Sequence, residues 1–212
     1  MLKKIQAATG ILFALFLVVH LFNTWLAAFG PQVYDSVQGV VRVVYQFPPL
    51  EALLLAALAV HMVVGVMRIV KEPKRDLNWR GKLHRYAGFF LMVFIAGHIT
   101  AVRGSSWFYD VYPGFAGLAF SIEAIPGYFY PYYFLLGVAG FYHGLNGLGI
   151  ALTRLGWTWR LSSGQLRTAS MVATVLMTVA LLGLGGVLFD VGDPSQSDFA
   201  ALALEIVGES AP

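Results

Sequence analysis

Histidines are the residues of this chain whose type and spacing point most clearly to chemistry. Two of them end similar apolar stretches: GILFALFLVVH runs from Gly10 to His20, and GFFLMVFIAGH runs from Gly88 to His98. An imidazole inside an apolar segment costs several kcal/mol, on the order of 2–7, unless it has a partner. Neutral imidazole binds metal ions, and histidine also relays protons. The pattern therefore indicates metal binding or proton transfer in an apolar medium.

The composition is too apolar for a soluble domain. Of 212 residues, 58% are hydrophobic and only 12% are charged, and the mean hydropathy is +0.71. Cysteine is absent, which excludes disulfides, thiolate metal sites and covalent cofactor attachment through cysteine. We therefore expect a membrane protein, with the lipid bilayer as a partner and no nucleic acid.

Five segments are long enough to cross a bilayer, which takes roughly 20 apolar residues. They predict an all-α integral membrane protein with five transmembrane helices in a single membrane domain. Prolines suit a first helical turn, so Pro48 and Pro49 mark the second start and Pro131 the fourth. The expected helices are 5–29, 48–70, 82–103, 130–153 and 167–189. The first has the basic start of a signal peptide, but its apolar run is long for one.

Basic residues predict the orientation, because cytoplasmic links are rich in them. With a cytoplasmic N-terminus, only Arg42 and Arg103 fall outside and nine of the eleven acidic residues do so. This predicts a multi-pass protein of the cytoplasmic (inner) membrane with its C-terminus outside. The loop 104–128 and an acidic tail, 190–212, are then outer, and the tail segment FAALALEIV predicts a short amphipathic helix. The cytoplasmic set is Lys3, Lys4, Arg68, Lys71, Lys74, Arg75, Arg80, Lys82, Arg85, Arg154, Arg160 and Arg167.

Depth in the membrane sorts four histidines into two pairs. At ~1.5 Å rise per residue, His20 and His98 lie ~22–24 Å from the cytoplasmic ends of their helices. His61 and His143 lie ~14–15 Å from those ends. The first pair is therefore nearer the outside and the second nearer the cytoplasm.

Two histidines from facing helices at one depth can hold the iron of a porphyrin between them. Both axial positions are then filled, which leaves electron transfer as the task of the iron. We expect a four-helix bundle core with two haems and a peripheral fifth helix, whose Met171 and Met177 are not needed as ligands. Glycines give room for a flat macrocycle, or only for close helix packing: Gly10, Gly65, Gly88, Gly97, Gly137, Gly140, Gly144 and Gly147. Any single histidine could instead be a core residue bonded to backbone.

Haem propionates are anionic and need donors near the membrane edge. Arg154 is eleven residues beyond His143, and Gln6 and His84 are each fourteen before a histidine, so all three are nearly in phase with a ligand. They are candidates for contact with propionates or a quinone. Arg154 could equally be a basic anchor of the cytoplasmic side.

These features together resemble the cytochrome b membrane anchor of succinate:quinone oxidoreductases, the single-chain type with five helices and two b haems. The resemblance covers roughly 5–190 and rests on three stretches: TGILFALFLVVHLFN, HRYAGFFLMVFIAGH and YHGLNGL. It implies that His20 and His98 ligate the outer haem and that His61 and His143 ligate the inner haem. It also implies that Gln6 and Arg154 contact inner propionates. Some relatives carry a glutamate for proton transfer where this chain has Phe141.

The resemblance implies partners as well. One is a flavoprotein with covalent FAD, and the other is an iron–sulfur protein docked on the cytoplasmic face. Electrons would pass from succinate to menaquinone or ubiquinone in a succinate dehydrogenase, and in reverse in a fumarate reductase. The complex could form a higher oligomer.

The quinone site has two candidate positions. One is the cytoplasmic mouth, with His84, Arg85, Trp79 and Tyr86; we expect His84 to have no partner at its depth. The other is the outer side near Glu51, although a carboxylate in a first helical turn also favours the helix dipole.

Two other functions fit the same features. Another quinone-linked complex, such as a formate dehydrogenase or hydrogenase, also uses histidines in membrane helices. A haem-free anchor or transporter would use them for packing or proton relay.

Overall fold

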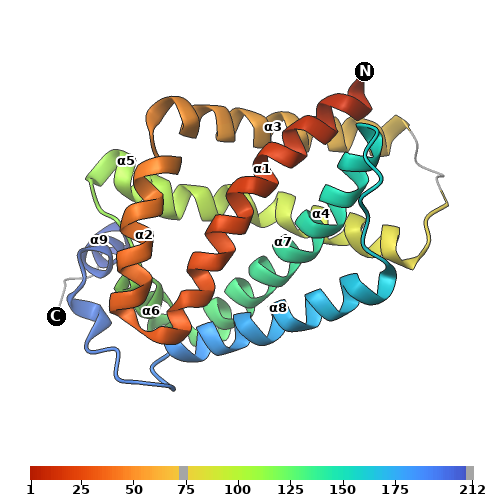
Figure 1. The fold of residues 1–212 in the computed structure, drawn as a ribbon. Coiled ribbons are helices and arrows are strands. Elements are labelled where there is room, and N and C mark those ends of the chain that lie inside the picture. Colours follow the sequence, from red (N-terminus) through yellow and green to blue (C-terminus); the bar gives the residue numbers. More distant parts are fainter. Residues whose placement is uncertain (72–75, 209–212) are drawn as a thin grey trace. The chain divides into compact units, whose positions relative to one another are not determined.

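The structure is a computed structural model that describes residues 1–71 and 76–208. The described part contains helices and no strand (Figure 1). Three charged residues of the predicted cytoplasmic link, Glu72, Lys74 and Arg75, lie outside the described residues, as does the end of the acidic tail at 209–212.

Five helices in the described residues are long and apolar enough to cross a membrane, which confirms the prediction of an all-α membrane protein. Only 6–33% of the residues in their most apolar windows are buried within the protein, so the remaining apolar side chains suit a lipid environment. The chain is therefore a multi-pass membrane protein. The spans are built on α1 (Leu2–Trp25), α3 (Pro48–Lys71), α4 (Trp79–Ile99), α7 (Pro126–Arg154) and α8 (Ser163–Leu184).

Two helix starts test the proline signals. Helix α3 begins at Pro48, as predicted. Helix α7 begins at Pro126, so the prediction that Pro131 marks its start is wrong and Pro131 lies inside the helix. Pro126 takes the first position, where a proline needs no hydrogen-bond acceptor. Pro131 is the sixth residue of the helix, beyond the four amides that have no partner within it.

Shorter helices fill the segments expected to be links. The segment 104–128 is not an open loop, because α5 (Ser105–Tyr109) and α6 (Gly114–Ala124) lie within it. A π-helical turn, Thr100–Gly104, joins α4 to α5, and α1 continues as a 3₁₀ turn, Leu26–Phe29. Helix α2 (Pro31–Tyr45) was not predicted, whereas the tail helix was, and it is α9 (Asp198–Val207).

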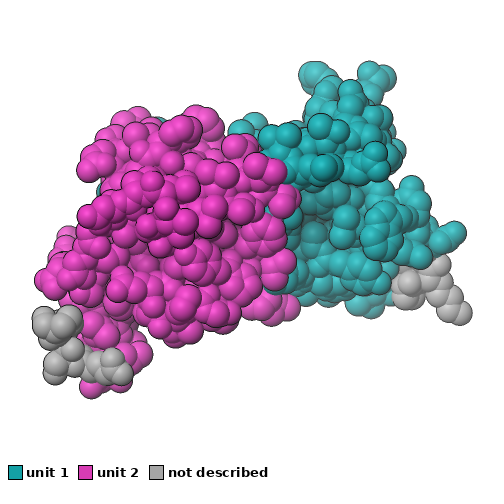
Figure 2. Space-filling model, turned by 90° about the horizontal axis from the view of Figure 1, so that it is seen from below, with its two compact units in different colours: residues 1–21, 41–92, 138–173 teal, residues 22–40, 93–137, 174–212 magenta. Residues whose placement is uncertain are grey.

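The described chain forms two compact units (Figure 2). Unit 1 comprises residues 1–21, 41–92 and 138–173, and unit 2 comprises 22–40, 93–137 and 174–212. Helices α1, α4, α7 and α8 each contribute residues to both units.

Unit 2 has a small core around Phe115, which is 1% exposed. The Phe115 ring meets Tyr34 edge-on, with the ring centroids 5.8 Å apart. Its backbone N–H donates to Oδ1 of Asp35 at 2.8 Å, which ties α6 to α2. Gly114 precedes it with φ +56°, a backbone conformation that glycine adopts without strain.

Unit 1 contains all of α3 together with the first part of α1, the first two-thirds of α4 and the second half of α7. Its helices meet at small residues: a methyl group added at Gly144 would lie 2.8 Å from Cδ2 of Leu17. Four of the five histidines lie in this unit, and the rings of His61 and His84 each lie next to the ring of His143.

Candidate functional site

The centre of the candidate site is the pair His61 on α3 and His143 on α7. Their ring centroids are 6.3 Å apart and their planes are nearly perpendicular, at 86°. An imidazole nitrogen binds a metal at about 2 Å, and the ring centroid is about 1 Å further away, so two imidazoles on opposite sides of one metal have centroids about 6 Å apart. The observed separation fits that arrangement.

Hydrogen bonds define the tautomer that both rings adopt when they are neutral. Nδ1 of His61 lies 3.2 Å from the backbone oxygen of Gln6, and Nδ1 of His143 lies 3.0 Å from the backbone oxygen of His84. A carbonyl oxygen only accepts, so each Nδ1 carries the hydrogen and donates. In the neutral ring Nε2 then keeps its lone pair. A metal-binding histidine commonly has this arrangement, because the second bond fixes the tautomer and the ring direction.

Each of these two imidazole rings packs against a glycine of a neighbouring helix. A methyl group added at Gly10 would lie 2.9 Å from Cε1 of His61, and one added at Gly88 would lie 2.8 Å from Cε1 of His143. Real side chains do not approach so closely, so glycine is required for the rings to lie against α1 and α4. These are the glycines that precede His20 and His98 by ten residues.

Each glycine and the carbonyl four residues before it form a unit that we call a seat. The first seat is the Gln6 carbonyl with Gly10, and it holds His61. The second seat is the His84 carbonyl with Gly88, and it holds His143. Residues four apart lie one above the other on a helix, so the imidazole contacts both parts at once.

Each seat also has a second glycine, which lies on the helix that carries the seated histidine. The Gln6 side chain lies against Gly65, with Nε2 3.4 Å from an added methyl group. The His84 side chain lies against Gly147, with Cε1 3.2 Å from an added methyl group. Gly65 and Gly147 each follow a seated histidine by four residues. The pairs α1 with α3 and α4 with α7 therefore repeat one contact pattern.

His84 differs from the prediction made for it. Its ring stacks on His143 with the centroids 4.1 Å apart and the planes 7° from parallel. The expectation that His84 has no partner at its depth is wrong. The count began at residue 82, whereas α4 begins at Trp79, so His84 lies three residues, or about 4.5 Å, deeper in the helix than counted.

The guanidinium of Arg68 lies next to the first seat. Oε1 of Gln6 accepts a hydrogen bond from Nη1 of Arg68, which is seven residues beyond His61 on the same face of α3. The Thr9 hydroxyl donates to the Ile5 carbonyl at 2.9 Å and lies 3.4 Å from Nδ1 of His61. Gln6 was predicted to contact the haem propionates, and its side chain is hydrogen-bonded to the guanidinium of Arg68.

A second cation ties α4 to α7. Nε of Arg80 donates to Oδ1 of Asn146 at 2.5 Å, and its Nη1 donates to the Leu161 carbonyl at 2.7 Å. The Tyr142 hydroxyl donates to the Arg80 carbonyl at 3.3 Å. Asn146 is only 1% exposed, so these bonds hold a buried amide and fix α4 against α7 next to the second seat.

The other predicted ligand pair is divided between the units. His20 lies in unit 1, where its ring stacks on Phe16 at 5.4 Å and 16°. His98 lies at the end of α4 in unit 2. The pairing of His20 with His98 therefore stays a prediction that rests on depth.

The predicted quinone residues do not all share a face of α4. Trp79 is 72% exposed and Tyr86 is 62% exposed, and Arg85 is partly buried. His84 is turned towards α7 instead. The structure thus separates His84 from the exposed aromatic residues.

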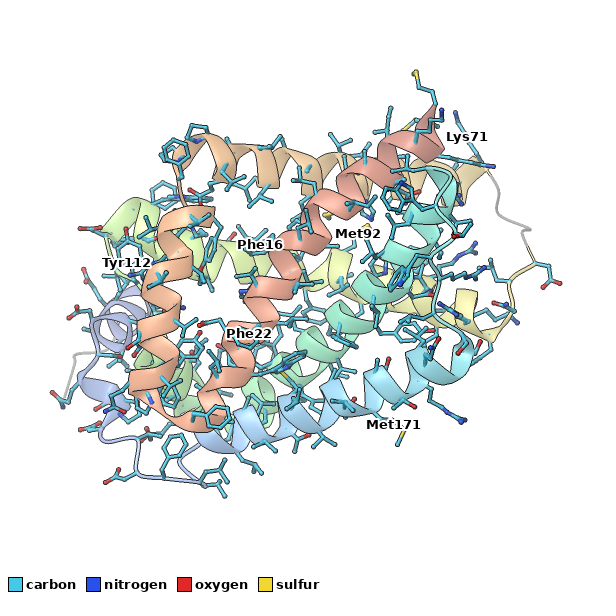
Figure 3. All side chains as sticks on the ribbon, viewed as in Figure 1. Phe16, Phe22, Lys71, Met92, Tyr112 and Met171 are labelled. Atoms are coloured by element: carbon cyan, nitrogen blue, oxygen red, sulfur yellow. The ribbon has the colours of Figure 1, made fainter. Side chains whose placement is uncertain are left out.

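The remaining predicted residues lie at helix ends. Glu51 is in the first turn of α3, where a carboxylate favours the helix dipole. Arg154 is in the last turn of α7, a position that equally favours a cation. Met171 projects away from α8 and is 63% exposed, whereas Met177 is buried at 3% exposure against Gly137 (Figure 3).

Sequence reasoning overlooked Arg68, Arg80, Asn146 and Thr9 as neighbours of the site. Arg68 was counted only for topology, although its spacing of seven from His61 places both on one face. Asn146 follows His143 by three residues, which is a comparable signal. For Arg80 and Thr9 the helix rotations had to be known first.

Comparison with known proteins gives no family for the chain. No protein-family model matches it, and no curated protein matches it.

Proposed function

We propose that the chain is the dihaem cytochrome b anchor of a succinate:quinone oxidoreductase, passing electrons between an iron–sulfur protein and membrane quinone. The observation that carries the proposal is the pair His61 and His143, with a centroid separation of 6.3 Å and both Nδ1 atoms donating to backbone carbonyls. That donor set suits an iron that already has four ligands from a macrocycle and needs two more.

A haem iron with two imidazole ligands carries one electron at a time and has no open position for a substrate. In this proposal His61 and His143 hold the inner haem, and His20 and His98 hold the outer one. Gln6 with Arg68, and Arg154 at the end of α7, are the candidate donors for anionic propionates. The seats keep the ligand rings in place and leave Nε2 free to bind.

The proposal includes partners of stated chemistry. A flavoprotein with covalent FAD would handle succinate, and an iron–sulfur protein would dock on the cytoplasmic face, where the predicted topology gathers twelve of the fourteen basic residues. Menaquinone or ubiquinone would take the electrons. The cytoplasmic end of α4, with Trp79, Arg85 and Tyr86, is the candidate quinone position, and the Glu51 end of α3 is the other.

The test is the haem content of the complex purified from membranes that contain the whole assembly. Pyridine haemochrome analysis should give two b haems per chain, with succinate-reducible absorbance. A value near zero would contradict the proposal and favour a haem-free anchor or transporter. Two haems with a formate dehydrogenase or hydrogenase subunit co-purifying, in place of the flavoprotein, would assign the chain to another quinone-linked complex.

A further inference from the structure

We propose that His84 is a positioning residue that fixes the plane of the His143 ring, and so sets the angle between the two axial imidazoles of the inner haem. The inference rests on the proposed function, and it moves His84 from the quinone candidates to the haem. It follows from the side chain at the carbonyl residue, which is Gln6 in the first seat and His84 in the second.

Three contacts place His84 on His143. Its backbone carbonyl accepts the Nδ1–H of His143 at 3.0 Å, which fixes one edge of that ring. Its own ring stacks on the face of His143 at 4.1 Å and 7°. Its Cε1 edge rests at Gly147, one turn beyond His143 on α7. One residue thus holds both an edge and a face of the ligand ring.

His84 itself has few other restraints. Its Nδ1 is buried and makes no hydrogen bond within the described residues. A buried nitrogen in this state makes no stabilising contact, so Nδ1 does not account for the position of the ring. The flat ring against His143 is therefore the feature that the position supplies.

Within the described residues, no ring stacks on the face of His61 in the first seat as His84 does on His143. Gln6 takes the position equivalent to His84, but its side chain is bonded to Arg68. His61 is held by its Nδ1 bond and by the contact with Gly10. Removal of the stack should therefore let the His143 ring turn and change the angle of 86° between the two rings.

The angle between axial imidazole planes has a direct spectroscopic signature. In a ferric low-spin haem, nearly perpendicular rings give a strongly anisotropic EPR signal with one dominant low-field feature. Rings closer to parallel give three resolved features. The wild-type inner haem should show the first type, identified as the signal that disappears in His61→Ala.

The experiment compares three His84 variants in the purified complex. His84→Ala should keep two haems per chain and shift the inner-haem signal towards the resolved type, and His84→Gln should do the same. His84→Phe supplies a flat ring without nitrogens, so it should keep the wild-type signal. Thr9→Val, next to His61, is the matched control, because its hydroxyl donates to the Ile5 carbonyl, and its signal shape should stay as in wild type.

Two results would overturn the inference. One is an unchanged inner-haem signal in His84→Ala. The other is a His84→Phe signal that changes as in His84→Ala, which would mean that the nitrogens matter and not the plane. If His84→Ala loses the inner haem, His84→Phe decides alone: a retained wild-type signal supports the inference and a lost one overturns it. Absence of haem from wild type would instead contradict the proposed function.

Discussion

The two seats of unit 1 use one backbone device and two different side chains. In both, a helical carbonyl accepts the Nδ1–H of a histidine from a neighbouring helix, and a glycine four residues later leaves room for the ring. At the carbonyl residue the halves differ: Gln6 is bonded to Arg68, whereas His84 stacks on His143. The tautomer is thus set by the backbone in both halves. The side chains differ: Arg68, bonded to Gln6, brings a positive charge near His61, and the His84 ring stacks on His143.

The largest expected effect comes from the histidines themselves. His61→Ala and His143→Ala should each remove the inner haem, because either leaves the iron with one protein ligand. His20→Ala and His98→Ala should remove the outer haem instead. Haem content and redox titration of the four variants would check this.

The pairing would be refuted by a mixed result. If His20→Ala and His98→Ala lost different haems, the depth argument would fail, even though the geometry of His61 and His143 would stand. If the histidines pair by depth, the two variants of each pair should lose the same haem to the same extent.

The next effect concerns the glycine seats. Gly10→Ala and Gly88→Ala should each lower the inner-haem content to less than half, because the methyl group would meet Cε1 at 2.9 or 2.8 Å and displace the ring. Overpacking of this kind costs about 1–3 kcal/mol. The outer haem should remain.

Gly140→Ala is the matched control for the seats. A methyl group there would meet Cδ1 of Leu17 at 3.8 Å, an ordinary contact, so both haems should be kept. Equal haem loss in this variant would mean that helix packing in general, and not the seats, explains the effect.

A smaller effect is expected from the cation of the first half. Positive charge near a haem stabilises its reduced state, so the inner haem should titrate at a higher potential than the outer one. Arg68→Gln removes a charge bonded to Gln6 and should lower the inner potential by roughly 20–60 mV, since 59 mV is a tenfold change for one electron. Potentiometric titration would measure it. An outer haem with the higher potential in wild type would show the charge argument to be wrong.

The smallest effect should come from Thr9. Its hydroxyl lies 3.4 Å from Nδ1 of His61 but donates to Ile5, so the main partner of His61 is the Gln6 carbonyl. Thr9→Val should therefore change inner-haem content by less than a tenth, consistent with a net hydrogen-bond contribution below about 1 kcal/mol. Haem loss comparable to that of Gly10→Ala would mean that the Thr9 hydroxyl also holds the His61 ring.

The spans could be predicted because length and hydropathy report membrane crossing directly. Helix α2 could not, because its apolar valines are spaced along an amphipathic helix of 15 residues that is too short to cross. The start of α7 was misplaced because Pro126 takes the first position, whereas Pro131 lies in the second turn, inside the helix. Neither error moved a histidine to another helix.

The site could be predicted in part. Spacing along α3 and α7 predicted that His61 and His143 lie at one depth, and the structure brings their rings together. Gly10 and Gly88 were predicted to give room or to allow packing, but their role as seats depends on which faces of α1 and α4 meet the partner helices. Hydropathy does not define those rotations when lipid surrounds the bundle. The stacking of His84 was missed for the same reason.

The spacing of ten residues between a seat glycine and the next histidine works as a ruler in α1 and in α4. One inserted or deleted residue would turn the downstream histidine by about 100° and move it by about 1.5 Å along the axis, while the seat stayed in place. Substitutions between Gly10 and His20 keep this spacing, although those at Phe16 and Leu17 would change contacts with His20 and Gly144. The length of the interval is therefore a constraint of its own, and the two helices keep the same interval.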